Sequence, residues 1–140
     1  MACSSLTSIT LPEGVTSIGD DAFKGCTSLA VIDVLAGNPN YASEAEVLFN
    51  KDKTTLIQCP GGKSGAYVIP PSVTSIGNSA FQSCHSLTGI TIPDSVTSIG
   101  DYAFKDCTSL TDVTIGDGLW PATDCIPCWR SRSPRWKRPP

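Results

Sequence analysis

Apolar residues recur along this chain with a period of 23 positions. Leu6 and Leu29 are one period apart, and residues 87–109 repeat residues 6–28 almost letter for letter. Residues 73–86 repeat the second half of the same unit. A repeat of this length is typical of a stacked array, so we expect a solenoid and not a globule with a single core.

Each unit has three parts with different patterns. In the first, apolar residues alternate and a proline follows, as in Ile90, Ile92 and Pro93, which predicts a half-buried strand. The second part reads Val-Thr-Ser-Ile-Gly, with its apolar residues inward and a glycine that permits a tight corner. The third places an Ala-Phe pair shortly before a cysteine, as in Phe104 and Cys107, and this spacing predicts one short helical or 3₁₀ turn.

The three parts together predict a β-rich α/β fold. We expect a right-handed solenoid of about four to five coils, with short strands on both faces and short helical or 3₁₀ turns. One unit alone buries little, because its apolar residues point to one side. In a stack they form a continuous interior, and each large side chain then contributes about 1.5–3 kcal/mol. We assign residues 1–115 to this array.

One unit of the array is elaborated. The distance from Leu29 to Leu87 exceeds one period by 35 residues, and we place the elaborated unit at 29–72. Residues 47–49 and 56–59 are apolar runs on either side of a loop with Asn and Asp, which predicts a β-hairpin. Residues 36–46, before the hairpin, are polar and rich in turn formers, and we interpret the whole stretch as an elaborated repeat and not as a separate domain.

The pattern fails after Ile115. Residues 116–140 contain all four arginines and all three tryptophans and have no period, which predicts an irregular, disordered basic tail. An out-of-frame carboxyl terminus would change the composition in the same way. Up to Trp129 the chain has 13 acidic residues against five lysines, a net charge of −8, and such a body does not attract nucleic acid or anionic membranes.

The repeats resemble those of the BspA-type leucine-rich-repeat proteins, whose unit has the same LTxIxIP, VTSIGxxAFxxC and SLT signatures. Residues 38–65 also resemble the variant repeat of that family, and the match covers residues 3 to about 115. The resemblance implies a curved leucine-rich-repeat solenoid with a parallel sheet on one face. It also implies a cell-surface or secreted protein of host-associated bacteria or parasitic protists, which adheres to matrix or plasma proteins or to other cells.

The array begins in the middle of a unit, since Cys3-Ser-Ser-Leu6 matches Cys26-Thr-Ser-Leu29. The first residues lack the basic and apolar regions of a signal peptide, and no apolar run has the length of a membrane span. We therefore expect this chain to be a piece of a longer array whose export signal lies elsewhere.

One column of the repeat is filled by cysteine, at Cys3, Cys26, Cys84 and Cys107. Neighbouring coils lie about 4.8 Å apart, but the parallel Cβ vectors disfavour disulfides, so we expect buried free thiols, with oxidised or metal-linked pairs as the alternative. Cys59 lies beside the hairpin and suggests nothing further. Cys125 and Cys128 form a C-x-x-C pair, but zinc needs four ligands and the only histidine, His85, takes a position filled by threonine elsewhere. We predict no metal and no cofactor.

The candidate binding face consists of the outward positions of the first-part strands. These are Ser8, Thr10, Val31, Asp33, Gly89, Thr91, Asp112 and Thr114, with Ala66 and Val68 in the elaborated unit. They are small and weakly polar and include none of the Trp, Tyr or Arg that anchor interfaces, so affinity would come from many repeats acting together. The alternative is a merely solvent-exposed sheet. Specificity could instead reside in residues 38–65, with Tyr41, Lys51 and Lys53.

No catalytic motif is present, and we predict that the chain is not an enzyme. The leading hypothesis, from the resemblance, is non-enzymatic protein–protein recognition in adhesion of a microbial surface to host matrix or plasma proteins. The first alternative is a structural spacer that contacts only neighbouring repeats of a longer array. The second is binding of nucleic acid or an anionic surface through the basic tail.

Overall fold

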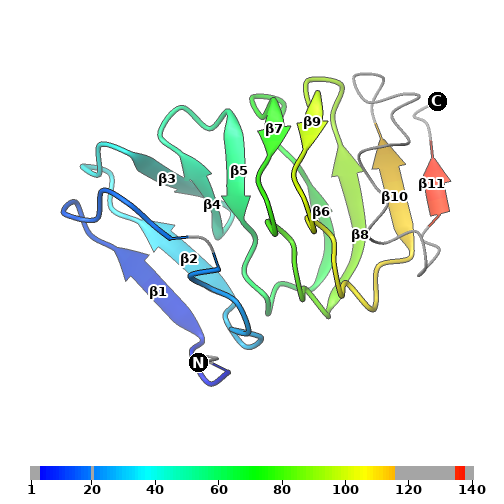
Figure 1. The fold of residues 1–140 in the computed structure, drawn as a ribbon, viewed down its shortest axis with the longest axis horizontal. Helices are drawn as coiled ribbons and strands as arrows, with labels where there is room; N and C mark the ends of the chain where they lie inside the picture. Colours follow the sequence, from blue (N-terminus) through cyan, green and yellow to red (C-terminus); the bar gives the residue numbers. More distant parts are fainter. Residues whose placement is uncertain (1–3, 20, 116–134, 138–140) are drawn as a thin grey trace.

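The chain winds into a β-solenoid in the computed structural model, which describes residues 4–19, 21–115 and the strand 135–137 (Figure 1). The strands from the first part of the units are β1 (Ser8–Leu11), β2 (Val31–Val34), β6 (Gly65–Val68), β8 (Leu87–Ile92) and β10 (Asp112–Ile115). The second part forms the two-residue strands β7 (Ser75–Ile76) and β9 (Ser98–Ile99). The predicted solenoid with short strands on both faces is therefore confirmed.

One period of the sequence makes one coil. β8 and β10 pair in parallel with Ile90 beside Val113, and β7 and β9 pair in parallel with Ile76 beside Ile99. Each pair of partners is 23 residues apart, so equivalent residues of successive units lie side by side. In the coils from β6 to β10, this register stacks the buried leucine, isoleucine, valine and phenylalanine positions into a continuous interior.

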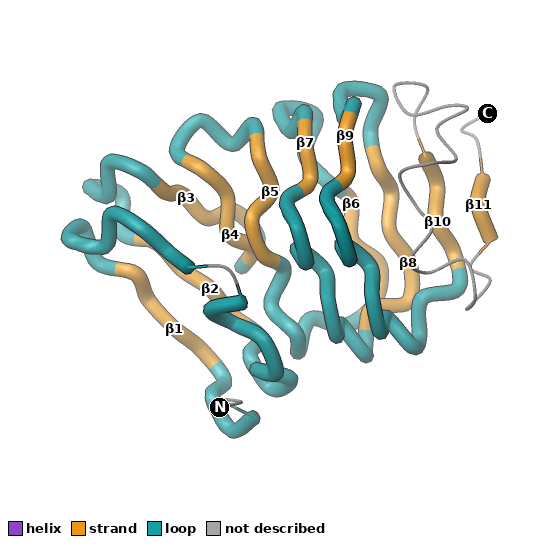
Figure 2. Tube along the Cα trace, in the orientation of Figure 1, coloured by secondary structure: helices purple, strands orange, loops and turns teal. Residues whose placement is uncertain are grey.

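The third part of the unit forms consecutive turns and no helix. The Gln82 N–H donates to the Ser79 carbonyl at 3.0 Å, and the Cys84 N–H donates to the Phe81 carbonyl at 3.2 Å. Ser79 and Ser83 have φ angles of 58° and 61°. A left-handed residue at every fourth position interrupts a right-handed helix. The helical turn that we expected is thus not confirmed, and Figure 2 shows only strands and loops in the described residues.

The elaborated unit contains the predicted hairpin and one strand that we did not expect. β3 (Tyr41–Glu44), β4 (Val47–Asn50) and β5 (Thr55–Gln58) form an antiparallel meander. Ala45 and Glu46 link β3 to β4 with φ angles of 51° and 67°. A two-residue turn with both φ angles positive normally contains Asn-Gly or Asp-Gly. The sequence Ala-Glu lacks this signal, so neither the turn nor β3 was predicted. β5 pairs in parallel with β7, which joins the meander to the second-part sheet.

The elaborated unit interrupts the first-part sheet. β1 and β2 form a two-stranded parallel sheet, whereas β6, β8 and β10 belong to a separate one. No Cα atom of β2 lies within 8 Å of a Cα atom of β6, and Figure 1 shows β1 and β2 tilted away from the strands of the second sheet. The single parallel sheet implied by the resemblance is therefore divided in two.

The interior is divided at the same place, and β4 is the partition. Leu48 packs into a small N-terminal cluster with residues of the first coils, while Val47 and Phe49 pack into the larger C-terminal cluster. Alternate residues of a strand point to opposite faces, so β4 serves both clusters. The N-terminal cluster consists of Leu11, Cys26, Leu29, Ile32, Val34 and Leu48.

Asn38 is the polar connection between the first coil and the elaborated unit, and it is fully buried. Its side-chain amide donates to the carbonyls of Pro12 and Val15, both at 2.9 Å. Its Oδ1 accepts the N–H groups of Asn40 and Tyr41 at 2.8 and 2.9 Å. A buried amide with all these partners fixes one conformation of the loop before β3.

Three residues of the segment that we expected to be irregular form the strand β11 (Arg135–Lys137). β11 pairs in parallel with β10, and Asp112 lies beside Arg135, again 23 residues away. The strand thus takes the position that the next coil would occupy. The other residues of 116–140, among them Cys125 and Cys128, lie outside the described part of the chain.

Candidate functional site

The predicted binding residues form short rows across the first-part strands. Ser8 lies beside Val31 and Thr10 beside Asp33 on the first sheet. On the second sheet one row runs through Ala66, Gly89 and Asp112, and the other through Val68, Thr91 and Thr114. The backbone hydrogen bonds of the ladders hold these rows, so the outward side chains stand on a rigid scaffold.

The exposure of these residues is uneven. Ser8, Thr10, Asp33 and Asp112 are exposed, whereas Val31, Thr91 and Thr114 are half-buried. Gly89 was expected at the surface and is buried instead. A Cβ atom added to Gly89 would lie 3.6 Å from the Ala66 Cβ and 3.9 Å from the Asp112 Cβ. The neighbours on both strands therefore cover a residue that has no side chain of its own.

The interruption of the sheet separates the eight predicted residues into two groups. One group lies on β1 and β2 and contains the carboxylate of Asp33. The other lies on β8 and β10 and contains the carboxylate of Asp112. The sequence predicted the outward rows but not this separation, because the hairpin that causes it follows no period.

Asp33 is held in place by the elaborated unit. The Ser43 hydroxyl donates to Asp33 Oδ1 at 3.0 Å, and the Ser43 hydroxyl oxygen accepts the Val34 N–H at 3.0 Å. Ser43 belongs to β3, so the unexpected strand orients a predicted binding residue. A carboxylate fixed in this way loses little side-chain entropy when a partner binds.

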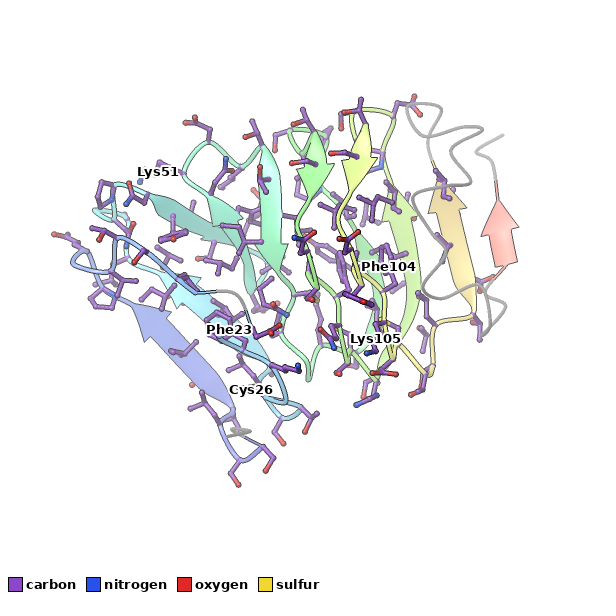
Figure 3. The ribbon with its side chains drawn as sticks, in the orientation of Figure 1. Phe23, Cys26, Lys51, Phe104 and Lys105 are labelled. Carbon is purple, nitrogen blue, oxygen red and sulfur yellow. The ribbon has the colours of Figure 1, made fainter. Side chains whose placement is uncertain are left out.

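The hairpin lysines proposed as a second place for specificity already have partners within the chain. The Lys51 ammonium, labelled in Figure 3, donates to the Ala36 carbonyl at 3.0 Å. Lys53 forms an ion pair with Glu44 at 3.1 Å. Tyr41 is half-buried against the N-terminal cluster. These residues stabilise the meander, and the outward rows remain the better candidate surface.

The buried thiols form a column that includes one cysteine we had set aside. Within the described chain, Cys26, Cys84 and Cys107 are buried and form no disulfide, as predicted, and the same holds for Cys59. The Cys84 thiol donates to the Cys59 carbonyl at 3.8 Å, and the Cys107 thiol donates to the Phe81 carbonyl at 2.9 Å. Cys59 therefore occupies the column position of the elaborated unit. The sequence did not indicate this position, because Cys59 does not follow the 23-residue period. Cys3 lies outside the described residues.

The column should make stability depend on alkaline pH. Burial, followed by the nearby Cys84, raises the pKa of Cys107 from 9.0 to about 12. Contact with Cys59 and burial also raise the pKa of Cys84. The folded chain holds these thiols protonated, so their contribution is complete below about pH 9 and is lost as the pH rises towards 12. We expect the free energy of unfolding, measured in urea, to fall across this range.

Cys107→Ala is the variant that checks this assignment. It should give a flatter alkaline profile, at the expense of some stability at every pH. Tyr67→Phe is a useful companion, because burial also raises the pKa of the Tyr67 hydroxyl. An alkaline profile unchanged by Cys107→Ala would contradict a role for this thiol.

No described part of the chain gathers three or more His, Cys, Asp or Glu side chains in a way that could hold a metal ion. His85 is exposed, and its Nδ1 lies 3.4 Å from the Thr108 hydroxyl. The histidine thus continues a row of exposed hydroxyl positions along the coils.

The family comparison agrees with the repeat geometry. The sequence profile of the BspA type leucine rich repeat region matches residues 1–64 and 63–121, in six copies. The chain belongs to this family. The matched residues include the elaborated unit as well as the regular ones.

Three solved structures of leucine-rich proteins share the fold. The pneumococcal vaccine antigen PcpA superposes with a TM-score of 0.73 at 33% identity, over 79% of this chain and 29% of that one. A leucine rich cell surface protein from Faecalibacterium prausnitzii has a TM-score of 0.69 and 38% identity, over 77% of this chain and 29% of that one. A leucine-rich repeat protein from Eubacterium ventriosum has a TM-score of 0.61 and 30% identity, over 79% and 36%.

This BspA-type chain thus spans only about a third of the length of these solved proteins. No curated protein matches it. Within the described residues there is no helix with the length and apolar character needed to cross a membrane.

Proposed function

We propose that this chain is a non-enzymatic protein-recognition module of a microbial cell-surface protein that adheres to host matrix or plasma proteins. The family supports a scaffold for protein binding, and one of the similar structures is described as a cell surface protein. The observation that carries the proposal is the pair of outward groups, on β1–β2 and on β8–β10, presented on hydrogen-bonded sheets.

Each group would supply a modest part of the binding energy. Small residues such as Ser8, Thr10 and Thr114 let a flat partner surface approach closely, and Asp33 and Asp112 would each attract a basic side chain of the partner. An exposed charge contact is worth up to about 1 kcal/mol, so two groups on one rigid scaffold, and further coils of a longer array, would act together.

The test is binding of the full chain to immobilised fibronectin and fibrinogen. We expect saturable binding that weakens about tenfold in the double variant Asp33→Asn/Asp112→Asn, because losing two such contacts costs about 1.4 kcal/mol. Asparagine keeps an oxygen that can accept the Ser43 hydrogen bond, so the fold should be retained. Asp101→Asn, an exposed acid on a turn away from these rows, is the matched control and should bind normally.

Other results would favour the alternatives. Equal affinity of the double variant and the control would mean that the outward rows do not bind these proteins. Binding that disappears at high salt and on deletion of residues 116–140 would assign it to the basic tail. No binding to either protein would support a spacer in a longer array.

A further inference from the structure

β6 is the edge strand of the sheet that also contains β8 and β10. It is the last strand in the order β11-β10-β8-β6, and among the described residues it pairs with β8 alone. The strand β2 of the previous coil would normally lie along its other side, but the elaborated unit has moved β2 away. An unpaired strand edge presents N–H and C=O groups that are ready to pair with another chain.

The unpaired groups belong to Ala66 and Val68. The N–H groups of Gly65 and Ile69 donate towards β8, to the carbonyls of Ser86 and Thr91 at 3.2 and 3.0 Å. Successive residues of a strand direct their N–H and C=O groups to opposite sides, so those of Ala66 and Val68 point away from β8. Within the described chain, neither the Ala66 N–H nor the Val68 N–H donates a backbone hydrogen bond outside the β6–β8 ladder.

A groove lies at the start of this edge, against the residues that lead into β6. Gly62 N–H donates to the Leu29 carbonyl at 2.7 Å, so the two coils touch just before β2 and β6 begin and then diverge. The groove has a volume of about 320 Å³ and is lined by Ala30, Val31, Glu46, Gly62, Lys63 and Ser64. Neighbouring strands lie about 4.8 Å apart, whereas no Cα atom of β2 lies within 8 Å of one in β6, so β2 does not take the place of a paired strand beside β6.

Only the β6 side of the groove can pair with an added strand. On the β2 side, the Ile32 N–H donates to the Glu46 carbonyl and the Val34 N–H to the Ser43 hydroxyl, both at 3.0 Å. The elaborated unit thus closes the edge of β2 and leaves that of β6 open. Val68 has 66% of its surface exposed, which is unusual for valine and gives an added strand an apolar contact beside the ladder.

The charge around the groove favours a basic occupant. Glu46 lines it and Glu44 lies at the same turn, with side chains 50% and 46% exposed, and Asp33 is exposed on β2. The Lys63 side chain is 15% exposed, and its ammonium donates to the Ala45 carbonyl and to Glu46 at 3.1 and 3.2 Å. Glu44 and Glu46 are paired with Lys53 and Lys63, so these charges together with Asp33 leave one net negative charge, in a body that is itself net negative.

We propose that the open edge of β6 binds an extended, basic peptide segment of a partner protein, which adds to the sheet as a further strand. The backbone of Ala66 and Val68 supplies the hydrogen bonds. Val68 contacts the added strand, and the carboxylates at the rim of the groove attract its basic side chains. Ala66 and Val68 also belong to the outward rows, but strand pairing uses their backbone groups at the edge of β6. Loss of strand pairing and loss of binding through the outward side chains can therefore be measured separately.

The test uses the full chain and a capped peptide of alternating lysine and valine as the probe. Hydrogen exchange followed by NMR should show slower exchange of the Ala66 and Val68 amides when the peptide is bound, with little change at Ile69, which already pairs with β8. The same peptide with alternate backbone nitrogens methylated is the matched control. It should bind about tenfold more weakly, because it cannot donate to the edge.

Two variants of the protein give an independent measurement. Val68→Pro removes the outward N–H, and proline is tolerated on an edge strand where that N–H faces solvent. It should weaken peptide binding about tenfold, whereas Val68→Ala keeps the N–H and should weaken it about threefold or less. If Val68→Pro does not fold, the methylated peptide with the unaltered chain still decides.

Four results would overturn the proposal. They are no binding of the peptide, binding without slower exchange at Ala66 and Val68, equal affinity for the methylated peptide, and amides of Ala66 and Val68 that are already protected in the free chain as its concentration rises. The last result would mean that a second copy of the chain occupies the edge.

Discussion

Phe81→Ala should destabilise the chain by about 3–5 kcal/mol, a large part of the 5–15 kcal/mol that holds a typical domain together. Phe81 is fully buried, and its ring stacks on Phe104 with centroids 5.1 Å apart and an angle of 11° between the planes. The centroid of the Tyr67 ring lies 6.3 Å from that of Phe81. Alanine would leave a cavity between coils that the hydrogen-bonded backbone cannot close, and urea unfolding followed by circular dichroism would measure the loss.

Phe23→Ala is the matched control, because Phe23 has the same place in its unit. Phe23 is only partly buried, at the border of the N-terminal cluster, and no described ring stacks on it. Figure 3 shows it beside β2, well apart from Phe104. We expect a loss below about 2 kcal/mol. Equal losses in the two variants would mean that the elaborated unit does not separate the stack of rings.

Gly100→Ala should also destabilise, by about 1–3 kcal/mol. A Cβ atom at Gly100 would lie 2.5 Å from the Asn78 backbone nitrogen and 2.7 Å from the carbonyl carbon of Gly77, and it would also overlap Asn78 Oδ1. Backbone atoms of the previous coil cannot move aside, because the Gly100 N–H donates to the Ile76 carbonyl at 2.8 Å. The variant would force two coils apart, and its urea midpoint should fall accordingly.

Gly19 has the same place in the first unit and provides the comparison. A Cβ atom there would meet nothing within 4 Å, because no described coil precedes it. Gly19→Ala should therefore be neutral or stabilise by about 0.4–1 kcal/mol, since alanine restricts the unfolded chain. If Gly100→Ala were as harmless as Gly19→Ala, the contact between the coils at Asn78 would not be as close as the structure has it.

Much of the fold could be predicted because period and register are the same quantity in a solenoid. A separation of 23 residues between Ile90 and Val113 becomes neighbouring positions on two strands, so the inward and outward rows follow from the sequence. The hairpin between β4 and β5 was also predictable, since two apolar runs enclosed a loop of turn formers. The family resemblance carried the cell-surface expectation, which the residues alone do not contain.

The elaborated unit is where prediction from the sequence failed. Ala45 and Glu46 form a turn without the residues that usually mark it, so β3 was missed together with its contact from Ser43 to Asp33. Cys59 was set aside because it follows no period, although it lies beside Cys84 in the thiol column. Contacts made once, between residues with no repeat relation, leave no periodic signal.

The sequence by itself determined the coil: its length, its buried positions, its parallel register and the rows on its surface. Only the tertiary structure decided which copies of one motif are equivalent in energy. Phe23 and Phe81, or Gly19 and Gly100, occupy equivalent positions of the repeat but have different neighbours along the stack. The same holds for the open edge of β6, which exists because a hairpin elsewhere displaces β2. Burial and pairing depend on the adjacent coil, and that coil is remote in the chain.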